Sequence, residues 1–224
     1  MPSASALTTE GLIKHNLADS LRAEIVSGAL QPGTKIVEAE WASKFGVAQG
    51  SIREALNILA HDGFVTKQAG RSARVVNFSH ADILQLYQIR GAMEGLAARL
   101  VATNNCDLSI LQNCVNSMRI AVRENKPEEL LDADLNFHLR LCELSGNRFL
   151  IEHSTRILLP LFAFMRIRVI SIGQETSPWG DGLEEHQRIV DLLRDRMGEV
   201  AEQYVKAAME SFLRAAAVSW ERRT

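Results

Sequence analysis

The sequence predicts a mainly α-helical protein in two parts, and three observations lead to that expectation. Ala, Leu, Glu and Arg are abundant while aromatic residues make up 6% of the chain, a balance that favours helix over sheet. Apolar residues recur at helical spacing along most of the 224 residues, as amphipathic helices require. The β-like segments are two short runs between residues 64 and 77, and they separate a small N-terminal part from a longer helical part.

The N-terminal part begins with a helix expected over residues 17–30, where apolar side chains share one face. Pro32 ends this helix, because proline cannot continue it. A second helix is expected over residues 38–45 and a third over 51–61, with a glycine turn at Gly46 between them. A support helix followed by two helices around a tight turn indicates a helix-turn-helix, whose second helix can lie in a major groove of DNA.

Two short runs follow the third helix. FVTKQ (64–68) and ARVVN (73–77) are rich in β-branched residues and flank a glycine-bearing loop, which predicts a β-hairpin. A hairpin directly after a helix-turn-helix makes a winged helix-turn-helix. We therefore expect a DNA-binding domain with a small hairpin wing over residues 10–77.

From residue 79 to residue 222 almost everything is expected to be helical. Ser79 with Asp82 three positions later predicts a capping box at the start of the first helix. The connections are short, which indicates an antiparallel all-α bundle. The six expected helices of this second domain, residues 79–222, cover residues 81–103, 107–124, 127–145, 147–172, 181–196 and 199–222.

Composition excludes several classes of protein. Apolar residues make up 46% and charged residues 23% of the chain, the balance of an ordinary globular protein. No window holds the roughly 18–20 uninterrupted apolar residues of a membrane helix, and the N-terminus lacks the pattern of a signal peptide. Three widely spaced cysteines fit a reduced, cytoplasmic compartment better than a disulfide framework. We expect a cytoplasmic protein that does not bind membranes.

The overall charge does not indicate DNA binding, so any DNA contact depends on where individual basic residues lie. Residues 1–78 hold eight Lys and Arg against seven Asp and Glu, and the whole chain has a net charge of −2. Arg53, one turn into the third helix, can contact a guanine edge or a phosphate, although it could instead pair with Glu54 or Glu24. Other basic residues that can contact DNA backbone or the minor groove are Lys44, Lys67, Arg71 and Arg74.

The second domain carries a possible metal site. Asp134 and His138 are spaced i, i+4, which puts a carboxylate and an imidazole on one helix face. His186 opens a later helix and is a third candidate ligand. The alternative is an ordinary pair on the surface of a helix, with His186 as a cap residue.

The same domain contains candidate residues for binding an acidic ligand. Arg90 is the first choice for a carboxylate clamp, because its planar fork matches a carboxylate. An intrahelical ion pair between Arg90 and Glu94 is the alternative. Arg140 is a further cation expected to face the bundle interior in part.

Two sets of motifs resemble a known family. SGALQPGTKIVEAEWASKFGV and SIREALNILAHDGFV resemble the DNA-binding domain of the GntR family of bacterial regulators. LYQIRGAMEGLAARL, DADLNFHLRLCELSGN and LEEHQRIV resemble the FadR-type effector domain of that family, also called the FCD domain. The resemblance implies a transcription regulator, expected to be a repressor, that binds a palindromic operator as a homodimer and responds to a small carboxylate effector.

The resemblance also assigns roles to individual residues. Gln49, Gly50 and Ser51 stand where the family usually has Arg-Thr-Pro, so Gln49 and Ser51 take DNA-binding positions, and Gln49 can read an adenine edge. Asp134, His138 and His186 match three of four metal ligands. Phe212 matches the position of the fourth, a histidine, and lines the effector site by the same comparison.

Three protein ligands can still bind Zn²⁺ or Ni²⁺, with water or an acid completing the shell. Two other classes of function stay open. One is a metal-dependent enzyme built on the same three ligands, for which no general base or nucleophile is found nearby. The other is an architectural DNA-binding dimer whose bundle binds no effector.

Overall fold

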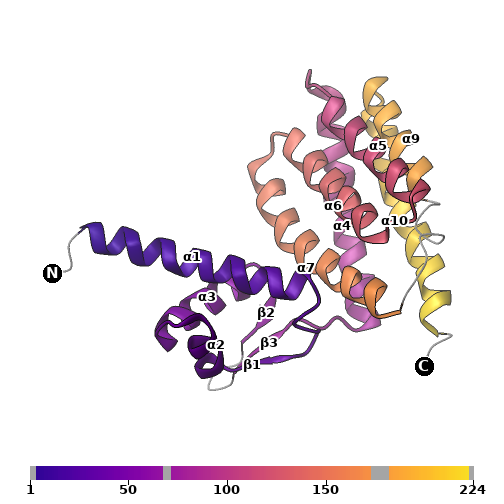
Figure 1. The fold of residues 1–224 in the computed structure, drawn as a ribbon. Helices are drawn as coiled ribbons and strands as arrows, with labels where there is room; N and C mark the ends of the chain where they lie inside the picture. The colour runs from indigo at the N-terminus through magenta and orange to yellow at the C-terminus, as the bar shows by residue number, and fades with distance from the viewer. Residues whose placement is uncertain (1–3, 68–71, 173–181, 222–224) are drawn as a thin grey trace. The chain divides into compact units, whose positions relative to one another are not determined.

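The structure, a computed structural model, describes residues 4–67, 72–172 and 182–221 (Figure 1). It is mainly helical with a small sheet near the N-terminus, which confirms the expected fold class. The chain forms two compact units, of which the first contains residues 1–78 together with residues 159–172. The remaining residues form the second unit. Among the described residues, no helix combines the length and apolar content that crossing a bilayer requires.

The described residues up to Phe78 form three helices of the first unit: α1 (Ala4–Val26), α2 (Glu38–Phe45) and α3 (Gln49–His61). The prediction placed the first helix at residues 17–30, so α1 starts earlier and ends earlier than its apolar spacing indicated. It ends ahead of Gly28, whose φ of 80° lies outside the helical region. The core contains apolar side chains from α1, α3 and the segment after α3, among them Leu21, Ile25, Ile52, Leu56, Leu59 and Phe64.

The turn between α2 and α3 depends on Gly46. Its φ of 65° and ψ of 35° are left-handed, and its N–H bonds to the carbonyls at the end of α2. Glycine adopts this conformation without the steric penalty that a Cβ brings. The third helix was expected to begin at Ser51, but α3 begins at Gln49. Gln49 and Gly50 therefore belong to the first turn of α3, and the connection from Gly46 is shorter than predicted.

The wing is a three-stranded antiparallel sheet in the order β1-β3-β2. The expected hairpin is present as β2 (Val65–Thr66) and β3 (Ala73–Val75). The third strand, β1 (Lys35–Ile36), was not predicted, because two residues are too few to show a strand pattern. β1 pairs with β3, which brings the linker after α1 into the wing.

In the described part of the chain after Phe78, six helices are present, and they match the predicted six. Their bounds are α4 (His80–Thr103), α5 (Ser109–Arg123), α6 (Pro127–Leu144), α7 (Arg148–Ile172), α9 (Gly182–Arg194) and α10 (Gly198–Glu221). The part of α7 from residue 159 onward groups with the first unit. The capping box at the start of α4 is confirmed, because Ser79 Oγ accepts from the Asp82 N–H and the Asp82 carboxylate accepts from the Ser79 N–H.

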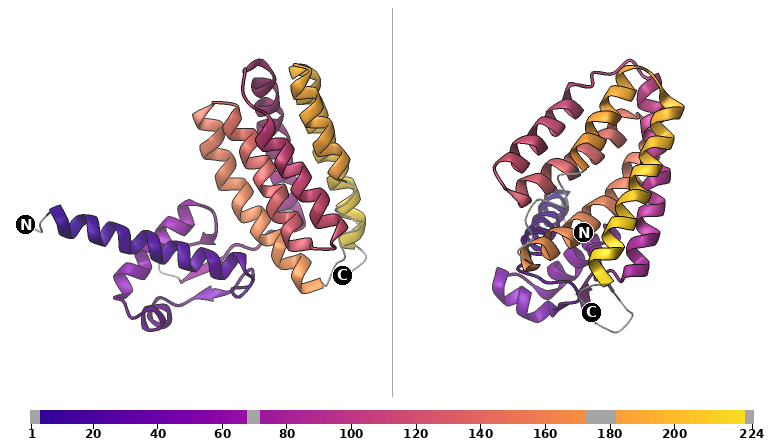
Figure 2. Two further views of the ribbon diagram at one scale, coloured as in Figure 1. Left: turned by 45° about the horizontal axis from the view of Figure 1, so that its top comes forward. Right: turned by 90° about the vertical axis from the view of Figure 1, so that its right-hand side faces the viewer.

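Helices α4 and α10 lie side by side, as the right-hand view of Figure 2 shows. Two glycines on α4 allow the close approach. A Cβ on Gly95 would lie 3.1 Å from the carbonyl oxygen of Glu202, and one on Gly91 would lie 3.7 Å from Cα of Lys206. α4 also packs against α6 and α9. The buried face of α4 is therefore placed next to the two helices that carry the predicted metal ligands.

Candidate functional sites

The exposed face of α3 carries polar side chains four residues apart. Gln49, Arg53 and Asn57 are all exposed, whereas Leu56 and Leu59 on the opposite face are fully buried. Spacing of four residues puts such side chains in a row along one side of a helix. The row contains an arginine and two amides, side-chain types that can form paired hydrogen bonds with base edges in the major groove. Asn57 was not predicted, although its i+4 spacing from Arg53 is visible in the sequence.

Ser51, the other predicted DNA-binding residue of α3, is half-buried in the first turn of the helix. Its backbone N–H bonds to the carbonyl of Ala48 at 3.0 Å. Its contribution to DNA binding stays a prediction.

Arg53 is held by an acidic side chain of α2. Its Nε and Nη2 donate to Oε2 of Glu38 at 3.0 and 2.7 Å. Neither Glu54 nor Glu24, the partners considered from the sequence, is the one that the structure gives for this ion pair. The hydrogen bond and the charge of Glu38 raise the pKa of Arg53. Because the arginine side chain is 57% exposed, its fork is oriented by Glu38 while remaining accessible.

Lys44, at the end of α2, contacts two side chains of the first unit. Its Nζ lies 2.8 Å from Oε1 of Glu24 and 4.2 Å from the centre of the Trp41 ring. Glu24, considered as a partner of Arg53, thus pairs with Lys44. The lysine side chain is 52% exposed, which leaves it accessible for backbone contact.

Two predicted basic residues lie on the strands of the wing or directly after them. Lys67 donates to Oδ1 of Asn57 at 2.7 Å, so it lies beside the polar row of α3. Arg74, on β3, is exposed and donates to the carbonyl of Gly33 at 3.0 Å. The third, Arg71, lies outside the described residues.

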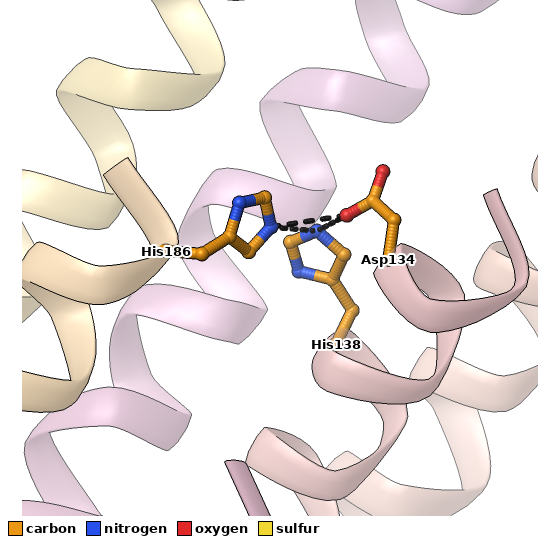
Figure 3. A group of neighbouring side chains, drawn as sticks. All are labelled: Asp134, His138 and His186. Atoms are coloured by element: carbon orange, nitrogen blue, oxygen red, sulfur yellow. Dashed lines mark hydrogen bonds and ion pairs between the residues drawn. The ribbon is translucent and has the colours of Figure 1, made fainter. Parts of the chain in front are cut away.

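The predicted metal ligands converge inside the second unit. Asp134 and His138 project from α6 and His186 from α9, and Figure 3 shows the three side chains turned toward one another. Oδ1 of Asp134 lies 3.0 Å from Nε2 of each histidine. The two Nε2 atoms are 3.4 Å apart. The structure therefore brings together residues that are 48 positions apart in the sequence, and His186 is not merely a helix cap.

These donor atoms fit a divalent cation. Ligands bonded at about 2.0–2.2 Å, as for zinc, lie roughly 3 to 3.5 Å from one another around the ion. Nδ1 of His186 lies 2.5 Å from the carbonyl oxygen of Gly182, so in the neutral ring Nδ1 carries the proton and Nε2 has a free lone pair. One carboxylate and two imidazoles suit Zn²⁺ or Ni²⁺ and leave positions for exogenous ligands.

The charged side chains of this cluster shift one another's pKa values. Burial would raise the pKa of Asp134, but hydrogen bonding and charge from His138 and His186 outweigh burial and hold that pKa far below its usual range. Burial would lower the pKa of His138, yet the charges of Glu94 and Asp134 raise it to about 8. A metal ion bound at Nε2 of His138 would take the place of a proton on that nitrogen.

The predicted effector residues Arg90 and Glu94 lie next to the metal ligands. Both are buried, and Nε of Arg90 donates to Oε1 of Glu94 at 2.8 Å, so the ion pair considered from the sequence is present. Oε2 of Glu94 forms an ion pair with Nδ1 of His138. Arg90 also lies over the Tyr87 ring, 4.7 Å from its centre, and Tyr87 stacks on Phe212 of α10.

Phe212 therefore occupies an aromatic stack. Its ring lies 5.0 Å from the Tyr87 ring at an interplanar angle of 10°. A phenyl ring supplies no metal ligand, so among the described residues three clustered side chains, and not four, could hold a metal ion here. Tyr87, the residue that receives Phe212, was not singled out from the sequence.

Two other candidates lie elsewhere. Arg140 pairs with Glu143 and lines an open groove of about 500 Å³ between α5 and α6, together with Cys114 and Asp132. Its side chain is 44% exposed, so it faces the bundle interior at most in part, and its role in effector binding stays a prediction. His153 is exposed on α7 and is not among the clustered residues that could hold a metal ion.

Comparison with known proteins agrees with both halves of this description. Residues 13–75 match the model of bacterial regulatory proteins of the gntR family, and residues 85–211 match the FCD domain. The chain belongs to the GntR family of regulators with an FCD domain. It is accordingly a transcription regulator and not an enzyme.

Individual relatives are distant but cover most of the chain. The uncharacterized HTH-type transcriptional regulator YdhC of Bacillus subtilis (strain 168) is 28% identical over 195 residues, 84% of each chain. A probable D-xylose utilization operon transcriptional repressor of Paenarthrobacter nicotinovorans is 24% identical, covering 98% of this chain and 95% of the relative. Among solved structures, E. coli McbR/YncC has a TM-score of 0.76 at 17% identity, covering 95% and 99%, which supports the fold.

Proposed function

We propose that this GntR regulator is a FadR-type repressor that binds a palindromic operator as a homodimer and releases it when a small organic acid binds the FCD domain. The exposed row on α3 carries the DNA-binding half of this proposal. The convergence of three metal-ligating atoms in the bundle carries the other half. Relatives described as operon repressors support the sign of regulation.

The chemistry of α3 and the wing suits duplex DNA. Gln49, Arg53 and Asn57 offer hydrogen bonds to base edges or phosphates, while Lys44 and Arg74 add positive charge to the same unit. Two copies related by a twofold axis would read two half-sites, as helix-turn-helix dimers do. All three cysteines lie in the described chain as free thiols, as we expect for a protein that acts on DNA in the cytoplasm.

The proposed effector site centres on Asp134, His138 and His186. A divalent metal bound there would act as a Lewis acid that attracts a carboxylate. The histidines would hold the ion through Nε2, and Asp134 would balance its charge. The phenyl ring of Phe212 in place of an imidazole removes one ligand, which favours an effector that supplies its own oxygen atoms.

Coupling between the two units needs no direct contact between DNA and effector. An effector that binds one arrangement of the dimer more tightly than another shifts the population toward it. The operator does the same for the arrangement that fits DNA. The two ligands then weaken each other's binding by equal factors.

The DNA-binding half is tested by replacing Arg53 with Ala and measuring affinity for a duplex from upstream of the regulator's own gene. A lost bidentate contact to a base edge reduces affinity by about 1–3 kcal/mol per protomer, and a lost phosphate contact lowers the salt slope by about 0.9. Arg123→Ala on α5 is the matched control, because that side chain is 74% exposed on the other unit. Equal affinity of R53A and wild type would contradict the proposal.

The effector half is tested by titrating Zn²⁺ or Ni²⁺ into wild-type protein and into His138→Gln, followed by a panel of mono-, di- and hydroxycarboxylic acids. We expect wild type to bind the metal and the variant to bind it far more weakly. An acid from the panel should then release operator DNA from metal-loaded wild type. Equal metal binding by H138Q would remove the metal site from the proposal and leave the DNA-binding half intact.

A further inference from the structure

An ion pair is buried inside α4, at the edge of the metal-ligand cluster. Arg90 and Glu94 are 3% and 1% exposed. Removing two charges from water is unfavourable, and apolar residues of similar size stabilise a core at least as well as such a pair. The pair therefore adds little to stability by itself, which directs attention to what else it contacts.

Glu94 uses its two carboxylate oxygens differently. Oε1 accepts from Nε of Arg90 at 2.8 Å, whereas Oε2 pairs with Nδ1 of His138. The opposite nitrogen of that imidazole, Nε2, faces Asp134 at 3.0 Å. His138 is thus fixed at both ring nitrogens, with Glu94 on the side away from the ligand cluster.

Arg90 is itself held in place. Its guanidinium lies 4.7 Å from the centre of the Tyr87 ring, and Tyr87 stacks on Phe212. A cation over an aromatic face is favourable when both are out of water. This arrangement fixes the arginine, and the arginine in turn keeps Glu94 ionised and in one orientation.

Resting on the metal site proposed above, we propose that Glu94 is a positioning residue for His138. It accepts the proton of Nδ1, fixes the tautomer in which Nε2 is the metal ligand, and makes that nitrogen more basic. A carboxylate behind a metal-binding histidine does this in many metal sites. At its Nδ1, His186 faces a backbone carbonyl instead. Among the described contacts of the two histidines, a carboxylate lies at Nδ1 of His138 and not at Nδ1 of His186.

The experiment measures Zn²⁺ affinity by competition with a chromophoric chelator. Glu94→Gln should weaken binding by about 10- to 100-fold, the usual effect of losing such a partner. Glu143→Gln is the matched control, since Glu143 is also a carboxylate paired with an arginine but is 45% exposed on the surface of α6. We expect no change in zinc affinity for this control.

A second variant distinguishes a loss of zinc affinity from a loss of folding. Glutamine at position 94 leaves Arg90 buried without its counter-charge, which can destabilise the bundle. The double variant Arg90→Met with Glu94→Leu removes both charges together and is expected to fold. It should show the same loss of zinc affinity as E94Q.

Wild-type protein gives an independent readout through the nitrogen NMR signals of the His138 ring, assigned with H138Q. In the zinc-loaded protein we expect the proton on Nδ1 and the metal at Nε2. Zinc bound through Nδ1, or unchanged affinity in both Glu94 variants, would overturn the positioning role. If wild type binds no zinc, both this role and the proposed metal site fail. If H138Q weakens binding but neither Glu94 variant does, only the positioning role fails.

Discussion

The contact between Glu38 and Arg53 predicts that Glu38 sets the sequence preference of the regulator. Replacing Glu38 with Gln removes the carboxylate that orients the arginine fork through Nε and Nη2. Arg53 then samples more rotamers before DNA binds, and ordering it on the operator becomes less favourable. At the same time one negative charge leaves the DNA-binding unit, which strengthens binding to any duplex.

The expected size of the effect follows from how exposed Arg53 and Glu38 are. Arg53 and Glu38 are 57% and 24% exposed, so their ion pair is of the surface kind, with a coupling of about 0.2–1 kcal/mol. The free energy of unfolding should therefore change by less than about 1 kcal/mol in the variant. Two protomers on one operator double the coupling to about 0.4–2 kcal/mol, which corresponds to a ratio of roughly 2- to 30-fold.

The assay is fluorescence anisotropy with an operator duplex and a scrambled duplex at one fixed salt concentration. We expect E38Q to lower the ratio of the two affinities by that factor, with tighter binding to the scrambled duplex. Glu54→Gln removes the same charge from α3 without breaking the pair and should leave the ratio near that of wild type. An unchanged ratio in E38Q, or an equal fall in E54Q, would refute the reasoning.

Three further predictions concern the second unit. Phe137→Ala should lower the free energy of unfolding by about 3–5 kcal/mol, because this fully buried ring packs edge-on against both clustered histidines. Urea titration measures this change. A loss below 1 kcal/mol, roughly the scale of a surface substitution, would count against the prediction. Ser79→Ala removes the capping box of α4 and should lose about 1 kcal/mol, whereas Ser79→Asp, which can still cap, should lose less in the same titration. The pKa of His138 rises from 6.5 to about 8 on folding. The protonated ring therefore stabilises the metal-free protein fully below pH 6.5, and this contribution to the free energy of unfolding is lost as the pH rises through 8. Unfolding measured at several pH values should show this decline in wild type and not in His138→Gln.

The elements of the fold were largely predictable from the sequence, because their signals are local. Apolar spacing and glycine turns placed α2 and the six bundle helices to within a few residues, and Ser79 with Asp82 marked the start of α4. The two-residue strand β1 was missed, since its pairing with β3 joins residues nearly 40 positions apart. The early start of α1 was missed because its first residues lack a regular apolar stripe.

For the candidate metal site, the sequence indicated which residues could be ligands but not how they meet in the fold. Spacing placed Asp134 and His138 on one face of a helix, but only the packing of α4 against α6 and α9 brings His186 and Glu94 to them. The same spacing rule predicted the Arg90–Glu94 pair but not its burial. Arg53 pairs with Glu38 of α2 and not with Glu54 or Glu24, the partners considered from the sequence, because residue spacing does not show which acidic side chain of another helix lies beside α3.

The most direct measurement is the affinity of purified wild-type protein for duplex DNA from upstream of its own gene, at low and at moderate salt. We expect a complex whose logarithmic affinity falls linearly with the logarithm of salt concentration, and whose stability drops when zinc and a matching carboxylate are added together. Absence of any complex with DNA at low salt would contradict the proposal that the N-terminal unit binds operator DNA.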